Sequence, residues 1–326
     1  MSRLRRSLVS GLAAAAMLSI ALAGPASAVK FGTPDVSNEY PWVGLMVAVD
    51  PSGEPLWRCT GSLLSEDLFL TAGHCVGEPE ADPADQPDTV YIWFTNKVIN
   101  TDPQYIKNLE YEAEHGDDSI NLCLGTPDPN DAYRPVSGYP CGGYDAWGQP
   151  ESYEEWTGAL TIPQTYDVGV VHDLHWVGTI PSEFGTIADI GTVQELAEST
   201  GKGNIEFTVV GFGLQSVKPV ESAIKQRMIG TVSFVNLQSA LTCEKGSQFV
   251  NNPNCWNLHY SNNPGQGHGG SGGTCFGDSG GPVLYQGEIV AVNSFVLNSN
   301  CNGAGFGYRV DTELVYDFLA DFGYTP

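Results

Sequence analysis

Positive charge is scarce in this sequence. Its 326 residues include 14 lysines and arginines against 38 aspartates and glutamates, which gives a formal net charge of −24 at pH 7. Nucleic-acid-binding proteins cluster lysine and arginine on one face, and adhesion to anionic lipid also depends on cationic side chains. The composition therefore argues against a nucleic-acid partner and against an anionic membrane partner, and it is typical of an acidic surface that favours solubility.

Long apolar runs are also missing, except near the N-terminus. Three arginines among residues 3–6 precede a mostly apolar run at residues 8–22, which Gly24-Pro25 cuts short of a full membrane span. Ala26-Ser27-Ala28 then forms an A-x-A cleavage site. We expect residues 1–28 to be a secretory signal peptide rather than an anchor. Its removal leaves 14 − 3 = 11 cations against 38 acids, a net charge of −27.

No two cysteines have the spacing C-x-x-C, so zinc binding is a poor explanation for the eight cysteines. In an exported chain, eight cysteines indicate four disulfides, although spacing alone does not choose among the many pairings. The simplest arrangement joins neighbours along the chain. It gives the pairs Cys59–Cys75, Cys123–Cys141, Cys243–Cys255 and Cys275–Cys301.

Glycines surround one serine in the stretch Thr274 to Pro282, which reads TCFGDSGGP. Glycine permits backbone angles that other residues resist, so such a loop can turn its N–H groups inward. Inward N–H groups beside a serine hydroxyl supply what acyl transfer needs, a nucleophile and a cradle for the negative oxygen that develops on the attacked carbonyl. We expect Ser279 to be the nucleophile and the N–H groups of Gly277 and Ser279 to form the oxyanion hole.

Two further segments carry residues that could activate this serine. The segment LTAGHC places His74 at the end of an apolar run, and the segment YDVGVV opens an apolar strand with Asp167. A carboxylate buried in such a strand needs a partner, and the imidazole N–H of His74 would supply it. Asp173 is the competing aspartate, but it follows the strand and is flanked by histidines. The sequence therefore predicts a catalytic triad of His74, Asp167 and Ser279.

The order of the motifs separates two classes of hydrolase. In α/β-hydrolases, which also carry a G-x-S-x-G turn, the histidine follows the serine. All six histidines of this chain precede Ser279. With TAGHC first, DVGVV second and GDSGGP third, the chain resembles the chymotrypsin-like (trypsin-type) secreted serine peptidases, from about Val29 to Phe318. It looks like a bacterial member of that family.

The resemblance implies an all-β fold of two packed antiparallel β-barrels with a C-terminal helix. We expect an N-terminal barrel in residues 29–180, with an acidic loop and an insertion over 108–160, and a C-terminal barrel with the terminal helix in residues 181–326. Short apolar and β-branched runs separated by turn residues support this reading. Residues 251–273 are rich in asparagine, glycine and proline and are expected to be loop.

The resemblance also implies how the chain is held together around the serine. All of the cysteine pairs named above except Cys123–Cys141 are similar to bridges of the family. After signal-peptide removal, the new N-terminus at Val29 is expected to fold inward so that its ammonium pairs with Asp278. A buried pair of this kind would shape the oxyanion loop, because neither charge tolerates burial alone.

Substrate preference is also given by the resemblance. Gly273 stands where trypsin-type enzymes carry an aspartate, so a preference for lysine or arginine is not supported. Ser294, Phe295 and Val296 resemble the segment along which the substrate backbone pairs, and Gly305 lines the pocket on the opposite side. Val296 replaces a glycine at the pocket mouth, and a branched residue there should exclude large side chains. We expect a preference for small or medium apolar residues.

These observations together predict a secreted, extracellular serine endopeptidase, a hydrolase that acts as a monomer on protein or peptide substrates. The triad needs no cofactor and no metal, and the acidic, proline-rich residues 78–88 leave calcium binding as an open alternative. No membrane partner is expected after signal cleavage. Two other functions stay open, a catalytically silent binding protein on the same scaffold and an esterase that uses the same triad.

Overall fold

The computed structural model describes residues 29–50, 55–77, 87–96, 144–152, 166–199, 205–215, 217, 225–237, 257–263 and 272–325. The expected signal peptide, most of the acidic loop, much of the expected insertion, and the pairs Cys123–Cys141 and Cys243–Cys255 lie outside these residues. Among the helices in the described ranges, none combines the length and apolar character needed to cross a bilayer.

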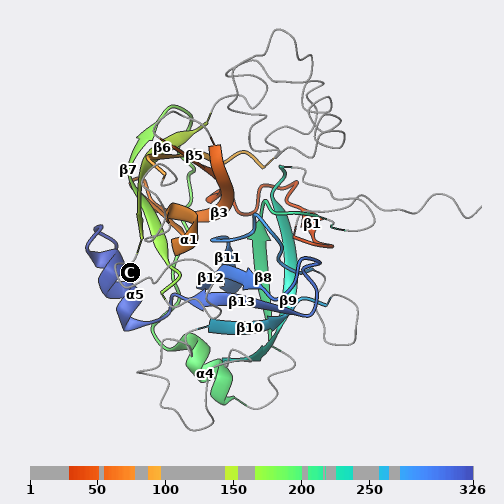
Figure 1. Cartoon of the computed structure of the whole chain (residues 1–326). Coiled ribbons are helices and arrows are strands. Elements are labelled where there is room, and N and C mark those ends of the chain that lie inside the picture. The colour runs from red at the N-terminus through yellow and green to blue at the C-terminus, as the bar shows by residue number, and fades with distance from the viewer. Residues whose placement is uncertain are drawn as a thin grey trace, which may run out of the picture.

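The first barrel is closed and antiparallel, with the strand order β2-β3-β4-β7-β6-β5. Apolar and β-branched residues dominate β2, β4 and β5, and every residue of β2 is buried. The strands are β2 (Val43–Val49), β3 (Pro55–Ser65), β4 (Leu68–Thr71), β5 (Thr89–Trp93), β6 (Ala146–Ser152) and β7 (Gly169–Trp176). In Figure 1 this barrel carries the orange to yellow-green strands.

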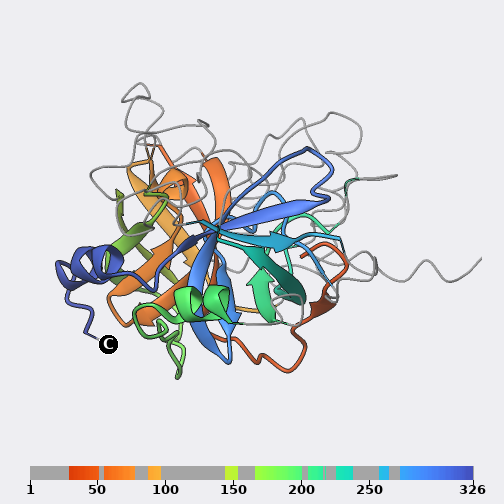
Figure 2. The same cartoon turned by 90° about the horizontal axis from the view of Figure 1, so that it is seen from below.

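The second barrel has the order β9-β10-β13-β12-β11-β8, and pairing between β8 and β9 closes it. Figure 2 shows the two barrels side by side from below. Its strands are β8 (Glu206–Gly211), β9 (Met228–Asn236), β10 (Asn257–Ser261), β11 (Pro282–Tyr285), β12 (Glu288–Val296) and β13 (Ala304–Arg309). The expected fold of two antiparallel barrels is therefore confirmed.

Three helices lie outside the barrel walls in the described residues: α1 (Gly73–Val76), α4 (Thr192–Glu198) and α5 (Glu313–Ala320). Helix α5 begins after Thr312, whose side chain accepts a hydrogen bond from the Val315 N–H, as expected of an N-cap. Val315, Phe318 and Leu319 form its buried stripe. The expected C-terminal helix is confirmed.

Two strands lie where the sequence predicts no strand. β10 falls inside residues 251–273, which the composition assigns to loop, and β6 falls inside the expected insertion at 108–160. The loop expectation is therefore wrong for Asn257–Ser261, and residues 146–152 of the expected insertion form a strand of the first barrel. In each case the strand is stabilised by ladders on both sides, since β6 pairs with β5 and β7 and β10 pairs with β9 and β13. Such pairing with distant segments overrides weak local propensity.

The ends of the described chain cross from one barrel to the other. The short strand β1 (Thr33–Pro34) precedes the first barrel but pairs with β9 of the second. Conversely, α5 follows the second barrel, but its stripe belongs to the apolar cluster that holds the first-barrel strands. Figure 1 shows α5 beside β7, and the rings of His172 and Phe322 lie 5.0 Å apart there.

The domain boundary at 180/181 stays a prediction.

A buried arginine adds a polar connection between the barrels. Arg227, just before β9, donates from Nε to the carbonyl of Val43 in β2 at 3.0 Å and from Nη1 to Asp35 at 3.1 Å. Both partners of the Arg227–Asp35 ion pair are fully buried. A buried charge is tolerated only when it is paired and hydrogen-bonded, as it is here. The arrangement holds β2 against the second barrel.

Candidate active site

His74 and Asp167 are brought together from two different strand ends of the first barrel. His74 lies in α1, directly after β4, and Asp167 lies two residues before β7. Strand β4 pairs with β7 so that Thr71 is opposite Gly169, which places the two strand ends side by side. Gly73 permits this close approach, because a Cβ atom on it would lie 3.2 Å from the backbone of Val168, a tight contact.

The imidazole of His74 contacts both oxygens of the Asp167 carboxylate. Nδ1 lies 3.0 Å from Oδ1 and 3.0 Å from Oδ2, and the backbone N–H of His74 donates to Oδ1 at 2.9 Å. The hydroxyl of Ser294 donates to Oδ2 as well. The side chain of Asp167 is fully buried, whereas that of His74 is 24% exposed. This geometry orients the ring through Nδ1, and Nε2 is the ring nitrogen that Asp167 does not contact.

The charge state of Asp167 follows from these contacts. Burial by itself would raise the pKa of the carboxyl, but the neighbouring His74 and the hydrogen bonds from His74 and Ser294 outweigh it, and the pKa is lowered. The group is therefore a carboxylate at neutral pH, the form that holds an imidazole N–H and stabilises an imidazolium.

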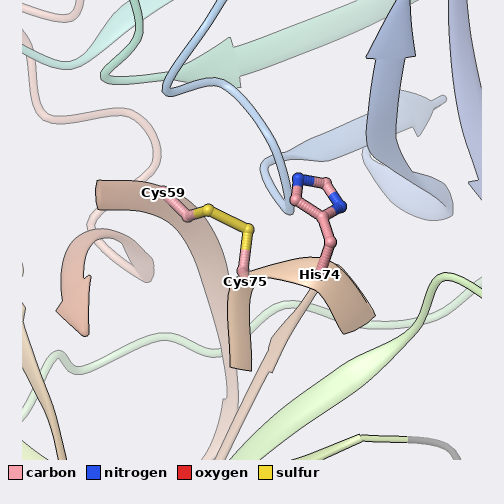
Figure 3. Close-up of side chains that lie close together, drawn as sticks. All are labelled: Cys59, His74 and Cys75. Carbon is pink, nitrogen blue, oxygen red and sulfur yellow. A yellow bond between two sulfur atoms is a disulfide. The ribbon is translucent and has the colours of Figure 1, made fainter. Parts of the chain in front are cut away.

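The Cys59–Cys75 disulfide fixes the helix that carries His74. It joins β3 to α1 (Figure 3), and the imidazole projects from the residue next to the bridge. The potential ligand atoms of Cys59, His74 and Cys75 lie within 4.8 Å of one another. Both sulfur atoms are used in the disulfide, so this group does not form a thiolate metal site.

The Ser279 loop is docked on the same part of the first barrel. The Thr60 N–H donates to the Ser279 carbonyl at 2.8 Å, and the Thr60 hydroxyl donates to the Gly277 carbonyl at 2.8 Å. A Cβ atom on Gly280 would lie 2.7 Å from the backbone nitrogen of Ala72, the residue that precedes α1. Ser279 is thus next in sequence to a glycine packed against the start of the helix that carries His74.

In the loop around Ser279, the backbone N–H groups of Gly277 and Ser279 do not take part in the loop's own hydrogen bonds. Gly277 and Gly280 have φ values of 90° and 77°, which glycine adopts readily. The N–H groups of Asp278, Gly280 and Gly281 donate to the carbonyls of Cys275, Asn293 and Asp278. Within the described part of the chain, no acceptor is bonded to the N–H of Gly277 or Ser279. Two free N–H groups beside a serine suit a developing oxyanion.

The side chain of Asp278 joins the Ser279 loop to the neighbouring backbone. Its carboxylate accepts hydrogen bonds from the Gly213 N–H at 2.8 Å and the Cys275 N–H at 2.9 Å. Full burial raises the pKa of Asp278 to about 7, against the lowering effect of these bonds and of the Arg58 charge. Val29, its expected ion-pair partner, is buried against Gly230 and Gly272. In the unprocessed chain its nitrogen belongs to the Ala28–Val29 peptide bond, so the ion pair stays a prediction about the processed protein.

The residues expected to contact substrate lie on β12, on β13 and just before the serine loop. Val296 on β12 is paired with Gly305 on β13, and the Cys275–Cys301 disulfide ties the following loop to the serine loop. Phe295 stacks on Phe306 of β13 at 4.6 Å between centroids. Gly273, Gly305 and Ser294 are buried. The hydroxyl of Ser294 serves Asp167, a role that the sequence analysis did not assign to it.

Sequence reasoning also missed two residues that shape the site. Thr60 docks the serine loop, as described above, and the side chain of Asn262 lies beside both Gly273 and Gly305. Thr60 follows a cysteine of an expected disulfide, and this was the only local signal. Asn262 lies in a stretch read as loop, and no local signal marked it.

Comparison with known proteins now places the chain in a family. The sequence profile of the trypsin family ("Trypsin") matches residues 29–139 and 184–316, which is most of the chain. The chain therefore belongs to the trypsin family of serine proteases, and its fold is the chymotrypsin fold.

Two curated relatives match over shorter stretches. The venom serine protease Bi-VSP of Bombus ignitus is 35% identical over 86 residues, covering 26% of this chain and 22% of that protein. The CLIP domain-containing serine protease B10 of Anopheles gambiae is 31% identical over 65 residues, covering 20% of this chain and 18% of that protein. The matches thus span about a fifth of these relatives. Both come from insects, so they do not support the expected bacterial origin.

Two solved structures share the fold at low sequence identity. The structure of HL collagenase has a TM-score of 0.55 at 15% identity, covering 91% of this chain and all of that one. An inactivated protease paralogue of the scabies mite, SMIPP-S-D1, has a TM-score of 0.52 at 14% identity, with the same coverage. Because an inactivated protein shares this fold, the fold alone does not establish catalysis, and the site residues must carry that argument.

Proposed function

We propose that this protein is a secreted serine endopeptidase that hydrolyses peptide bonds through Ser279, His74 and Asp167. The observation that carries the proposal is the pairing of His74 Nδ1 with both oxygens of a buried Asp167, on the helix against which the Ser279 loop is docked. A buried carboxylate that holds Nδ1 in this way orients the imidazole so that it can act as a base through Nε2.

In the proposed reaction, His74 accepts the hydroxyl proton of Ser279 as the oxygen attacks the substrate carbonyl. The tetrahedral intermediate places its negative oxygen at the N–H groups of Gly277 and Ser279. His74 then gives the proton to the leaving amine, which departs and leaves an acyl-enzyme. Water enters with His74 as base, and the ester is hydrolysed to release the acid and restore the serine. Loss of one oxyanion donor would cost about 3–4 kcal/mol of transition-state stabilisation.

Substrates of the proposed enzyme have a small or medium apolar residue before the cleaved bond. Gly273 supplies no carboxylate, so nothing at that position attracts lysine or arginine, and Val296 narrows the mouth of the pocket. Phe276 and Leu297 are 52% and 43% exposed near the proposed site, which suits an apolar substrate. In the proposal, the backbone of Ser294–Val296 pairs with the substrate, while the hydroxyl of Ser294 donates to Asp167.

The proposal includes export and processing. Residues 1–28 would be removed as a signal peptide, which frees Val29 to pair with Asp278, and the protein would act outside the cell as a monomer. The two described disulfides support an oxidising compartment, because such bridges persist outside the reducing cytosol.

Fluorophosphonate labelling followed by peptide mapping tests the central claim. The proposal expects one labelled residue, Ser279, no label in Ser279→Ala, and cleavage of a denatured protein substrate that falls by about 10⁴-fold or more in that variant. Asp167→Asn should reduce cleavage by about 10³–10⁴-fold with the fold intact. A folded, processed protein that takes no label would instead favour the silent binding protein. Ester turnover without peptide turnover would favour the esterase.

A further inference from the structure

The space behind the expected specificity pocket is occupied by an asparagine. A Cβ atom built on Gly273 would lie 3.1 Å from Oδ1 of Asn262, and one built on Gly305 would lie 2.9 Å from the same oxygen. One carboxamide is therefore adjacent to both glycines. Asn262 is fully buried, and the two glycines are buried as well. The carboxamide therefore occupies the space into which a side chain at either glycine position would extend.

The carboxamide of Asn262 is held in one orientation. Nδ2 donates to the carbonyl of Thr274 at 2.9 Å, and the N–H of Thr274 donates to Oδ1 at 3.1 Å. The backbone N–H of Asn262 donates to the carbonyl of Gly303 at 3.0 Å. These bonds join the end of β10 to the residue after Gly273 and to the loop before Gly305. The side chain cannot swing away without leaving buried polar groups of Thr274 unpaired, which is costly.

A side chain from β10 occupies the neighbouring space. Tyr260 is paired with Gly305 across the β10–β13 ladder, and a Cβ atom on Gly305 would lie 2.3 Å from the Tyr260 ring. The Tyr260 hydroxyl lies 3.1 Å from the Thr274 hydroxyl and donates to Asn293 at 2.7 Å. Position 305 is thus glycine because the side chains of Tyr260 in β10 and of Asn262, the residue after β10, take up the volume in which its own would lie.

We propose that Asn262 is a specificity-determining residue: its buried carboxamide forms an uncharged floor between Gly273 and Gly305 and makes the primary pocket shallow. This inference rests on the proposed peptidase function and refines its substrate class. Short side chains such as alanine and valine fit above the floor, beside Val296. Long side chains, whether apolar or cationic, are excluded by volume as well as by the missing carboxylate at position 273.

The test uses the processed protein and four peptides that differ only in the residue before the cleaved bond: alanine, valine, phenylalanine or lysine. We expect the wild type to prefer alanine and valine. Asn262→Ala should raise the ratio of kcat/KM for phenylalanine over alanine by tenfold or more, because a filled volume becomes open. Asn263→Ala is the matched control. That neighbour also accepts a backbone hydrogen bond, from Gly303 at 2.9 Å, but Asn263 is half-buried, and its loss should leave the ratio unchanged.

Asn262→Ser is a second variant for the case in which the alanine variant does not fold. Its hydroxyl is a polar group that can accept a hydrogen bond from the Thr274 N–H. Two results would overturn the inference. One is a folded Asn262 variant with the wild-type ratio, and the other is a wild type that cleaves after phenylalanine or lysine as readily as after alanine. A wild type that cleaves none of the peptides and takes no label at Ser279 would instead reject the proposed function, so the two failures are distinguishable.

Discussion

The hydroxyl of Ser294, on β12 of the second barrel, donates a hydrogen bond to the Asp167 carboxylate in the first barrel. Both groups are buried, and the same carboxylate also contacts His74. The contact joins the segment expected to bind the substrate backbone to the acid that orients the expected base. Ser294 is therefore a positioning residue for Asp167.

The first prediction concerns this contact. Ser294→Ala should lower kcat about 10- to 100-fold, because a hydrogen bond to a charged group contributes about 1.5–3 kcal/mol. The lost donor is one of the groups that lower the pKa of Asp167, so the acid limb of the pH–rate profile should move to higher pH. Rates measured from pH 4 to 9 check both effects.

Ser62→Ala is the control for that substitution. Ser62 is also a buried serine, but its hydroxyl has no hydrogen-bond partner among the described residues. Its removal should leave the rate and the pH profile unchanged. If Ser294→Ala and Ser62→Ala behave alike, Ser294 has no part in positioning the triad.

The second prediction concerns Asp278 and pH. In the unprocessed chain the pKa of Asp278 is raised to about 7, above its ordinary value of about 3.9 in an unfolded chain. The folded state then binds the proton more tightly than the unfolded state, so the contribution of this group to stability falls as pH rises from about 4 to 7. Urea unfolding across that range should show a decline that Asp278→Asn reduces.

Processing at Val29 changes this expectation. A free ammonium next to Asp278 would lower its pKa, and the decline between pH 4 and 7 should then shrink in the processed chain. Urea midpoints of the unprocessed and the processed chain, compared between pH 4 and 7, measure this difference. An identical pH dependence before and after processing would contradict the expected Val29–Asp278 ion pair.

The third prediction concerns Lys30. Its ammonium donates to the carbonyl of Asn300 at 2.7 Å and to the side chain of Asn302, and its backbone pairs with Gly273. Lys30→Met should lower the free energy of unfolding by about 1–3 kcal/mol, because the loop around Cys301 loses a charged donor. Val36→Ser, at a residue that is 74% exposed, should change it by less than about 0.5 kcal/mol. Equal effects of the two substitutions would show that the hydrogen bonds of Lys30 to Asn300 and Asn302 do not stabilise the fold.

The fourth prediction concerns the bridge beside His74. The Cys59–Cys75 disulfide spans a sequence separation of 16 residues, and loss of a loop of this size costs about 3 kcal/mol of stability through the unfolded chain. Replacing both cysteines with alanine should lower the unfolding free energy by about this amount. It should also reduce kcat, since α1 would no longer be joined to β3. Full activity in a destabilised variant would show that the bridge acts on stability alone.

Local sequence was sufficient for much of the fold. The apolar runs of β2, β4 and β5 and the Thr312 cap of α5 are local features of the sequence. β6 and β10 could not be predicted in this way, because their residues are mostly polar or poor strand formers and form strands through pairing on both sides. The pairing of β1 with the second barrel could not be predicted from the sequence either, since β1 is only two residues long.

The sequence by itself determined the chemistry that this site offers. The glycines around Ser279, the buried Asp167 and the position of His74 before both are local features, and residue type and spacing reveal them. Only the tertiary structure decided what surrounds them: Thr60 docks the serine loop, Ser294 binds Asp167, and Asn262 fills the space beside Gly273 and Gly305. The physical reason is sequence separation. Thr60 and Gly277 are 217 positions apart and Ser294 and Asp167 are 127 apart, and packing between distant strands leaves no periodic mark in a single chain.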